Sequence, residues 1–150
     1  MAWVTPTVVT TGSLITAAMW NQDVVNNPIS LTPTGWTFRI DGGGATIATG
    51  CYIGHEVPYK CDITAITLSG SPTGSACMDI YKSTYANLPS ACTDNITNDV
   101  GFMIASAIKY QDATLSGWTK AVTAFDWFDY AVKGASAITQ LSISVRANRS

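Results

Sequence analysis

The chain has 150 residues, of which 47% are hydrophobic and 12% charged, and eight basic against ten acidic residues give a formal net charge of −2. This length allows one buried core, and five Trp and six Tyr are present to fill it, so the composition excludes a disordered chain. Because basic residues are not in excess, we expect neither a nucleic-acid partner nor a membrane partner. Sparse charge beside many Ser, Thr and Asn residues is typical of extracellular and viral β-proteins, or of proteins covered by neighbours in an assembly, and we favour the assembly.

Residues 1–35 are predicted to form an arm that precedes the β-rich part of the chain. Residues 1–22 carry no charged side chain, but they lack the basic start of an export signal, and Pro6 with several Thr residues interrupts any apolar run. No stretch approaches the roughly 18 apolar residues of a membrane span. We therefore expect a soluble, unprocessed chain.

One short helix is predicted inside this arm, over residues 16–27. Thr16 is the expected N-cap, and Asn27 followed by Pro28 ends the helix, because Asn tolerates the left-handed cap and Pro cannot continue a helix. Residues 28–35 are interpreted as a linker. A helix this short is marginal alone and must dock on something. The residues expected to anchor the protein in its assembly are apolar side chains of the arm, namely Trp3, Ile15, Trp20, Val24 and Val25.

Residues 36–150 are predicted to form one antiparallel β-domain, because short β-branched runs with period-two patterning alternate with Gly, Pro and Ser turns. Strands are expected at Trp36–Asp41, Ala45–Ile53, Lys60–Leu68, Ala76–Lys82, Thr93–Thr97, Ala113–Thr119, Ala121–Lys133 and Ile138–Arg146. The apolar run Phe102–Ala107 is not assigned to an element. Short strands at roughly ten-residue spacing are typical of a β-sandwich or jelly roll, here preceded by a short N-terminal helix.

Two Gly-containing segments are predicted to be turns. The run Gly42–Gly44 leads into a strand and lacks the GK[ST] of a phosphate-binding loop, so a tight turn is the better interpretation. The segment Ser69–Gly74 combines Ser, Gly and Pro and is expected to separate two antiparallel strands. In the strand before it, the alternation changes phase at Ala65-Ile66.

The closing segment Ile138–Arg146 has the clearest alternation in the chain. Its inward-facing residues are expected to be Leu141, Ile143 and Val145. They are expected to pack against the alternating residues of an aromatic strand, Phe128, Tyr130 and Val132. Such a pair of faces predicts where the centre of the core lies.

The cysteines and the histidine do not form a recognisable metal or catalytic motif. No two of the four cysteines form a CxxC pair, and His55 is the only histidine, so no zinc site is predicted. Cys61 and Cys77 are interpreted as small buried hydrophobic residues, although three disulfide connectivities are possible on paper. His55 precedes Glu56, but neighbours on a strand point to opposite faces, so His55 is interpreted as a lone turn histidine.

One aromatic segment is a candidate for contact with a ligand. Asp126 and Asp129 flank Trp127-Phe128, which could form a sugar-binding platform, although aromatic residues on a strand more often belong to the core. The oxygen-rich set Asp94, Asn95, Asn98 and Asp99 lacks EF-hand spacing and is interpreted as a solvated loop. We therefore predict no cofactor, no metal and no enzyme site.

Two patterns together resemble a known group of proteins. The first is Gly12, Ile15-Thr16-Ala17-Ala18, Trp20-Asn21, Val24/Val25 and Asn27, which looks like a segment at the start of many small structural proteins of tailed bacteriophages. The second spans residues 39–146 and includes IDGGGATIATGCYIGHEVPYKCDITAITL, GSACMDIYKSTYANLPS, DNIT, LSGWTKAV and ITQLSISVR, and it resembles a β-rich phage and prophage virion domain. The run Phe125–Phe128 departs from that pattern, as do Cys51, Cys77 and Cys92.

The resemblance implies a non-enzymatic structural protein located in the virion. It implies a tail fibre, tail-tip or receptor-binding component that touches a host surface glycan or protein; the alternative is a capsid decoration or head-fibre protein. Partners would be other virion proteins and sister subunits, with a closed homo-oligomer, above all a trimer, as the expected assembly. A glycan-cleaving enzyme is a third hypothesis, and it would require two carboxylates that converge in a groove.

Overall fold

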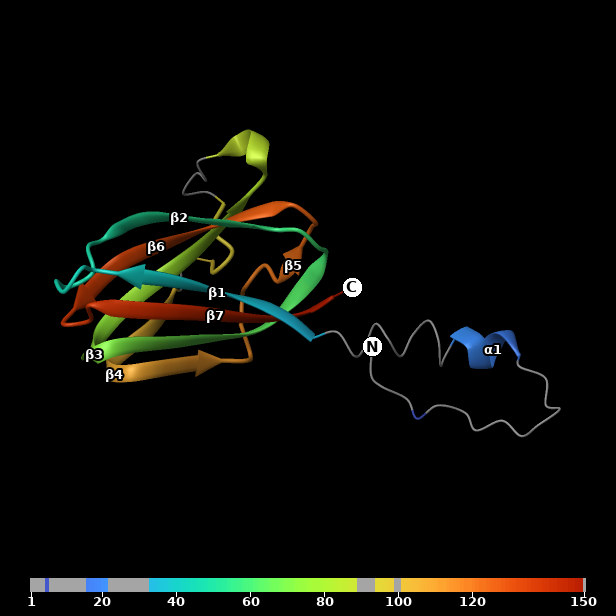
Figure 1. Cartoon of the computed structure of the whole chain (residues 1–150), viewed down its shortest axis with the longest axis horizontal. Coiled ribbons are helices and arrows are strands. Elements are labelled where there is room, and N and C mark those ends of the chain that lie inside the picture. The colour runs from blue at the N-terminus through green and yellow to red at the C-terminus, as the bar shows by residue number, and fades with distance from the viewer. Residues whose placement is uncertain (1–4, 6–15, 22–32, 89–93, 99–100, 150) are drawn as a thin grey trace.

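The structure, a computed structural model, describes residues 5, 16–21, 33–88, 94–98 and 101–149. In chain order its elements are helix α1 (Ala17–Trp20), strands β1 (Pro33–Asp41), β2 (Gly50–Val57) and β3 (Cys61–Ser83), the 3-10 helix η2 (Tyr85–Asn87), and strands β4 (Phe102–Asp112), β5 (Ala121–Val122), β6 (Asp126–Ser136) and β7 (Gln140–Arg149) (Figure 1). The predicted fold class is confirmed: the described chain is mainly β and antiparallel, with a short helix before the strands.

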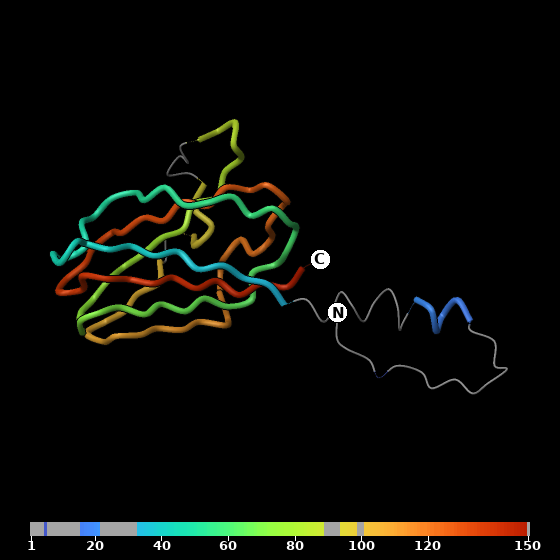
Figure 2. The backbone as a smooth tube through the Cα atoms, in the orientation of Figure 1, coloured from blue at the N-terminus to red at the C-terminus, as the bar shows by residue number. Residues whose placement is uncertain are grey.

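All seven strands belong to one sheet that curls back on itself. The order along the sheet is β1-β7-β3-β6-β2, and β4 and β5 both pair with β3. The long strand β3 makes the curl possible, because its first part pairs with β7 and its second part, from Ser75, pairs with β6. One half, containing β1 and β7, therefore faces the other, containing β6 and β2, as the two sheets of a sandwich do (Figures 1 and 2).

The predicted turn at Ser69–Gly74 is wrong, because β3 continues through it as one strand. The pairing with β4 is irregular between Ser69 and Ala76, which marks a bend rather than a chain reversal. Gly74 is required at this bend, since a Cβ there would lie 2.2 Å from the carbonyl oxygen of Ser136. Small turn-forming residues here let the strand pass from one half of the sheet to the other.

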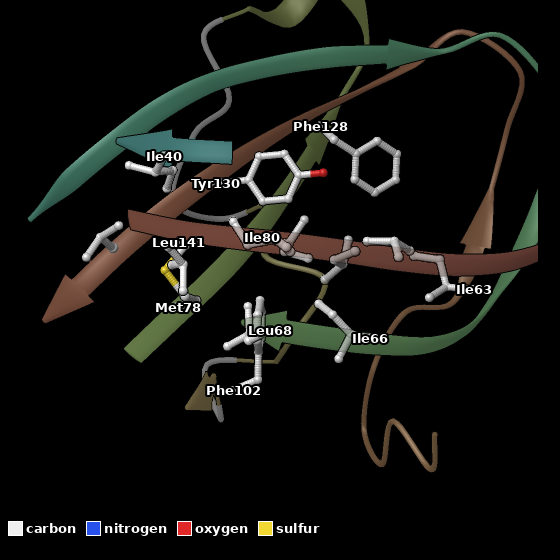
Figure 3. Packing of buried hydrophobic residues seen from close by; sticks show 14 of the residues in the cluster. Ile40, Ile63, Ile66, Leu68, Met78, Ile80, Phe102, Phe128, Tyr130 and Leu141 are labelled. Carbon is white, nitrogen blue, oxygen red and sulfur yellow. The ribbon is translucent and has the colours of Figure 1, made fainter. Parts of the chain in front are cut away.

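The core lies between the two halves of the sheet, and its buried side chains come from both (Figure 3). The predicted inward residues of the closing strand are 0–2% exposed and belong to this core: Leu141, Ile143 and Val145. The predicted aromatic face is equally buried in the same cluster: Phe128, Tyr130 and Val132. The expectation that these faces share one core is confirmed. Every described member of the cluster lies between Ile40 and Ala147.

The turn predicted at Gly42–Gly44 is confirmed. The backbone N–H of Ala45 donates to the carbonyl oxygen of Gly42 at 3.1 Å, and Gly43 and Gly44 both have positive φ angles, 63° and 87°. Two consecutive positive φ values are typical of a type I′ turn, which Gly adopts without a steric cost. The phase change near Ala65 is also confirmed, as a register shift in the pairing of β3 with β7.

Several strand boundaries differ from the prediction. β2 begins at Gly50 rather than Ala45, and β1 begins at Pro33, inside the predicted linker. The run Phe102–Ala107 is the first part of β4. The predicted strand Ala121–Lys133 is divided into β5 and β6 by a turn in which Asp126 N–H donates to the Thr123 carbonyl.

Two short segments predicted as strands are not strands where they are described. Residues 113–119 form a loop, and Leu115 is buried there without belonging to a strand. Within 94–97, Asn95 makes one isolated bridge with Tyr81. Residues 94–96 lie beside β3, because Lys82 N–H donates to the Asp94 carbonyl and Ile96 N–H donates to the Ile80 carbonyl. The loop 113–119 is joined to them through Thr119 N–H, which donates to the Ile96 carbonyl.

In the arm, the predicted cap of the helix is confirmed, because the Thr16 hydroxyl accepts a hydrogen bond from Met19 N–H at 3.2 Å. The predicted helix end at Asn27 lies outside the described residues.

Candidate functional site

Of the five predicted anchor residues, the structure describes Trp20. Its side chain lies on α1 and is 54% exposed, and it makes no contribution to the core cluster. The other four, Trp3, Ile15, Val24 and Val25, lie outside the described residues. The anchor role stays a prediction, with an exposed indole as the feature that the structure adds.

Asp126, from the predicted ligand platform, is held inside the fold. It is 7% exposed, and its Oδ2 lies 3.0 Å from Lys82 Nζ and accepts a hydrogen bond from Thr123 N–H at 2.8 Å. These contacts connect the start of β6 to β3 and to the turn before β6. Asp126 therefore shapes this corner of the domain.

Asp129 has a similar structural position. It is 4% exposed, and its Oδ1 accepts hydrogen bonds from Gly54 N–H at 3.0 Å and from Trp127 Nε1 at 2.9 Å. Trp127 is thereby oriented along β6 and stays half-buried, while Phe128 is in the core. The structure brings Trp127 and Asp129 into contact, whereas Asp126 contacts Lys82 and the Thr123 backbone instead; both carboxylates have partners within the chain. Ligand contact by Trp127 stays a prediction.

The outer face of the β6 half carries a buried polar network. Asp79, 4% exposed, lies 3.3 Å from Lys133 Nζ and accepts a hydrogen bond from the Thr97 hydroxyl at 2.8 Å. Lys133 also donates to the Tyr81 hydroxyl at 2.8 Å, and this bond, with the Asp79 carboxylate beside it, raises the pKa of Lys133. Thr97 N–H donates in turn to Asn95 Oδ1 at 2.7 Å, and Thr97 is buried on this face. Of the four residues predicted to form a solvated loop, Asp94 and Asn95 are half-buried and Asn98 is exposed, and Asp99 lies outside the described residues.

His55 is not a turn residue, which corrects the prediction. It lies in β2, half-buried, and its ring is 6.0 Å from Trp36, 6.4 Å from Phe38 and 6.1 Å from Tyr130, centroid to centroid. Its Nε2 is buried without a hydrogen-bond partner among the described residues. Burial lowers the pKa of His55, because the protonated ring would lose its hydration there.

The outer face of the β1–β7–β3–β4 half is polar and is built from rows of side chains. Residues directly opposite each other in antiparallel strands point to the same face, so the strand register gives these rows. They are Asp41-Gln140-Ser71, then Arg39-Ser142-Ser69-Lys109, then Thr37-Ser144-Thr67-Gln111, with Arg146 next along β7. Hydrogen bonds between Thr37 and Ser144 at 3.1 Å and between Gln111 and Thr67 at 3.2 Å confirm the alignment. We call these twelve residues the open face.

The open face carries three cations without a side-chain partner in the described part of the chain. Arg39, Lys109 and Arg146 are exposed, and none of them makes an ion pair or side-chain hydrogen bond within the described ranges. The one carboxylate of the face, Asp41, accepts hydrogen bonds from Gly43 N–H at 2.8 Å and from Gln140 Nε2 at 3.3 Å. The twelve residues of the open face therefore carry three positive charges and one negative charge, and Asp62, opposite Asn148 in the row beyond Arg146, places a second exposed carboxylate at that edge.

A groove of about 320 Å³ lies at one end of the open face. Side chains of Arg39, Asp41, Ser69, Gln140 and Ser142 line it. Hydrogen bonds between neighbouring turns fix its end, because Thr139 N–H donates to the Ser71 carbonyl and Gly42 N–H donates to the Thr139 carbonyl, both at 2.8 Å. The groove can bind a polar ligand through hydroxyls, an amide and a guanidinium.

Sequence reasoning missed this face. Its signal is present as the polar residues Gln140, Ser142 and Ser144 of the closing strand. What the sequence does not give is the strand order, which places Arg39 on one side of these residues and Ser69 on the other.

The part of the chain that the structure describes contains neither a metal-binding cluster nor a membrane-spanning helix. No group of three or more His, Cys, Asp or Glu side chains there is arranged to hold a metal ion. No helix in the same ranges has the length and apolar character needed to span a membrane.

Comparison with known proteins adds little to this description. No protein-family model matches the sequence, and no curated protein matches it. Among solved structures, the chain is similar to the "Cyanophage Pam1 capsid asymmetric unit", with 12% sequence identity and a TM-score of 0.37 over 79% of this chain and 84% of that chain. A likeness at this level assigns neither family nor role, so the functional argument rests on the sequence and on the geometry described above.

Proposed function

We propose that this chain is a non-enzymatic structural protein of a tailed-bacteriophage particle, and that it serves as a tail fibre, tail-tip or receptor-binding component. The sequence resemblance to phage virion β-domains supports a location in the phage particle. Asp126 and Asp129 are engaged in contacts within the fold, which is compatible with a structural role for both carboxylates.

The observation that carries the proposal is the direction in which β1 runs along the sandwich. β1 begins at Pro33, near the end of the predicted arm and opposite Asn148 of β7, and it runs to Asp41 at its other end (Figure 2). Asp41 is one of the residues that line the groove. Nine residues of strand at about 3.4 Å each separate the two ends by roughly 27 Å. A protein anchored through its first residues would thus present its groove at the distal end.

The arm supports the anchoring half of the proposal. The described core contains residues from Ile40 to Ala147 and none from the arm, so the β-domain does not use Trp20 for its own stability. An exposed indole on a four-residue helix is a contact surface for a particle protein or for sister subunits. Assembly as a closed trimer through this arm is the expected form.

The test is to locate the chain in purified particles by cryo-electron microscopy and to count its copies. A tail component is expected in a handful to tens of copies, whereas hundreds of copies spread over the shell would favour the alternative, a capsid decoration or head-fibre protein. Absence from purified particles would contradict the proposal altogether.

A second experiment tests the arm. Deletion of residues 1–30 should leave a folded, soluble β-domain that no longer joins particles. Trp20→Ala in the full chain is the milder form of the same change and should reduce incorporation without altering the melting temperature. Normal incorporation of the truncated chain would show that the anchor lies elsewhere.

A further inference from the structure

We propose that the open face binds an acidic polysaccharide, with Arg39 at the groove and Lys109 and Arg146 along the same surface as the groups that contact its carboxylates. This inference rests on the proposed function, because it takes the open face to be the part of a receptor-binding component that meets the host surface. It adds the chemical class of the host-surface ligand.

Charge is the first argument. Of the eight basic residues, four have a partner in the described chain: Lys82 and Lys133 in ion pairs, Lys120 on the Thr114 carbonyl, and Arg149 over the Tyr59 ring. Three of the remaining four lie on the open face, and Lys60 is the fourth. Cations gathered on one face of a chain with net charge −2 are complementary to an anionic ligand, and Arg39 offers the planar fork that pairs with a carboxylate through two hydrogen bonds.

Spacing is the second argument. Arg39 and Lys109 stand at opposite ends of one row, with Ser142 and Ser69 between them. Adjacent strands are about 4.8 Å apart, so three strand spacings separate the two cations by roughly 14 Å at the backbone. A single small anion cannot reach both, whereas an extended polymer with repeated charges can.

The third argument is the chemistry of the floor between the cations. Ser142 and Ser69 make no side-chain hydrogen bond within the described ranges, so their hydroxyls are free to exchange hydrogen bonds with sugar hydroxyls. Their short side chains leave the groove beside Arg39 unobstructed.

Other anionic partners fit this face less well. The large exposed apolar side chains of the described chain, Ile53, Tyr85, Met103, Ile108 and Phe125 among them, are not members of the open face. A protein interface needs an apolar or aromatic centre, and a single-stranded nucleic acid needs aromatic rings for stacking. A hydroxyl floor with cations at its ends favours a saccharide.

The experiment measures binding of defined oligosaccharides to the purified full-length chain by isothermal titration calorimetry at low and at physiological salt. The acidic probes are tetragalacturonate and a tetramer of α2,8-linked N-acetylneuraminate, and cellotetraose is the neutral control. We expect at least one acidic probe to bind, more weakly as salt increases, and cellotetraose to bind about tenfold more weakly or not at all. Failure of both acidic probes to bind overturns the proposal.

Matched variants locate the binding. Arg39→Gln should weaken binding of the acidic probe about tenfold or more, because it removes charge-assisted hydrogen bonds, whereas Lys60→Gln makes the same change of charge outside the face and should leave binding within about twofold. Equal effects of the two variants would overturn the assignment of the face. Equal affinity for a single-stranded DNA of matched charge would overturn the choice of a saccharide. All of these measurements use the isolated chain, so they are independent of whether the protein is found in particles.

Discussion

The indole Nε1 of Trp36 donates a hydrogen bond to the hydroxyl of Tyr130 over 2.9 Å, and this bond joins an edge strand of one half of the sheet to a central strand of the other. Phe38, two residues along β1, stacks on the same tyrosine ring with centroids 4.3 Å apart and planes 7° apart. β1 therefore closes the sandwich through side chains, since among the described strands it pairs only with β7.

Tyr130→Phe tests the energetic weight of this contact. The variant keeps the ring and its stacking but leaves the half-buried Trp36 N–H without its acceptor, which should lower the free energy of unfolding by about 1–3 kcal/mol. Tyr52→Phe is the matched control, because its hydroxyl donates to the Ala48 carbonyl in an exposed position. Urea denaturation of both variants is the measurement, and equal losses would show that the Trp36 bond has no special role.

His55 gives the chain a pH dependence whose sign can be worked out. Burial among aromatic rings lowers the pKa of His55 below its ordinary value of 6.5, so near pH 6 the unfolded chain binds more protons than the folded one. The free energy of unfolding should therefore fall as pH decreases from about 7 to 5, and His55→Phe should flatten the curve in that window.

His55 is the only histidine, and His55→Phe leaves every other titratable group in place, so comparison of the two chains isolates the contribution of this ring. Urea midpoints measured at several pH values, for the wild type and for His55→Phe, are sufficient. A wild-type curve that is flat between pH 7 and 5, or one that rises toward pH 5, would contradict the burial of the neutral ring.

The bend of β3 is tested by a pair of glycines. Gly74→Ala would place a methyl group 2.2 Å from the Ser136 carbonyl oxygen, so we expect a loss of about 1–3 kcal/mol in the free energy of unfolding. Gly134→Ala, in β6, is the control, because nothing lies within 4 Å of its Cβ position. Thermal melts should show a lower midpoint for Gly74→Ala alone. Equal behaviour of the two variants would mean that the strands separate more at the bend.

Local patterns predicted the parts of the fold that one strand can specify. The alternation of Leu141, Ile143 and Val145 identified the core face of β7, because the period of a half-buried strand appears directly in its residues. The glycines of the 42–44 turn were equally informative. In contrast, the Ser, Gly and Pro residues at 69–74 are compatible with a turn and with a bend, and only pairing with β4, β6 and β7 decides between them.

The open face was beyond sequence reasoning for a related reason. Arg39, Ser69 and Lys109 are far apart in the chain, and each is an ordinary polar residue of its own strand. They enter one row with Ser142 through the order β1-β7-β3-β4, which no local signal encodes. His55 was misjudged for the converse reason, because its neighbours in sequence include Gly54 and Pro58, whereas its neighbours in space are aromatic.

The cysteines are expected to be dispensable for folding. Cys61 is 1% exposed and Cys77 is half-buried, and both are free thiols. Burial raises the pKa of Cys61 to about 11, so at neutral pH it stays protonated and reacts slowly. Thermal melts with and without reductant should agree within a few degrees. A larger drop on reduction would reveal a structural disulfide, with a contribution of about 2–4 kcal/mol.

The closing strand provides the sharpest test of which face is buried. Ile143 is fully buried, opposite Phe38 of β1 and Leu68 of β3, so Ile143→Ala should leave a cavity and lower the free energy of unfolding by about 2–5 kcal/mol. Ser142→Ala changes the neighbouring residue on the open face, where the hydroxyl has no protein partner in the described chain, and should change stability by less than about 0.5 kcal/mol. Urea denaturation of the purified chain measures both. Equal losses would mean that the Ser142 face is covered in solution, and the open face would then be an interface between subunits rather than a ligand-binding surface.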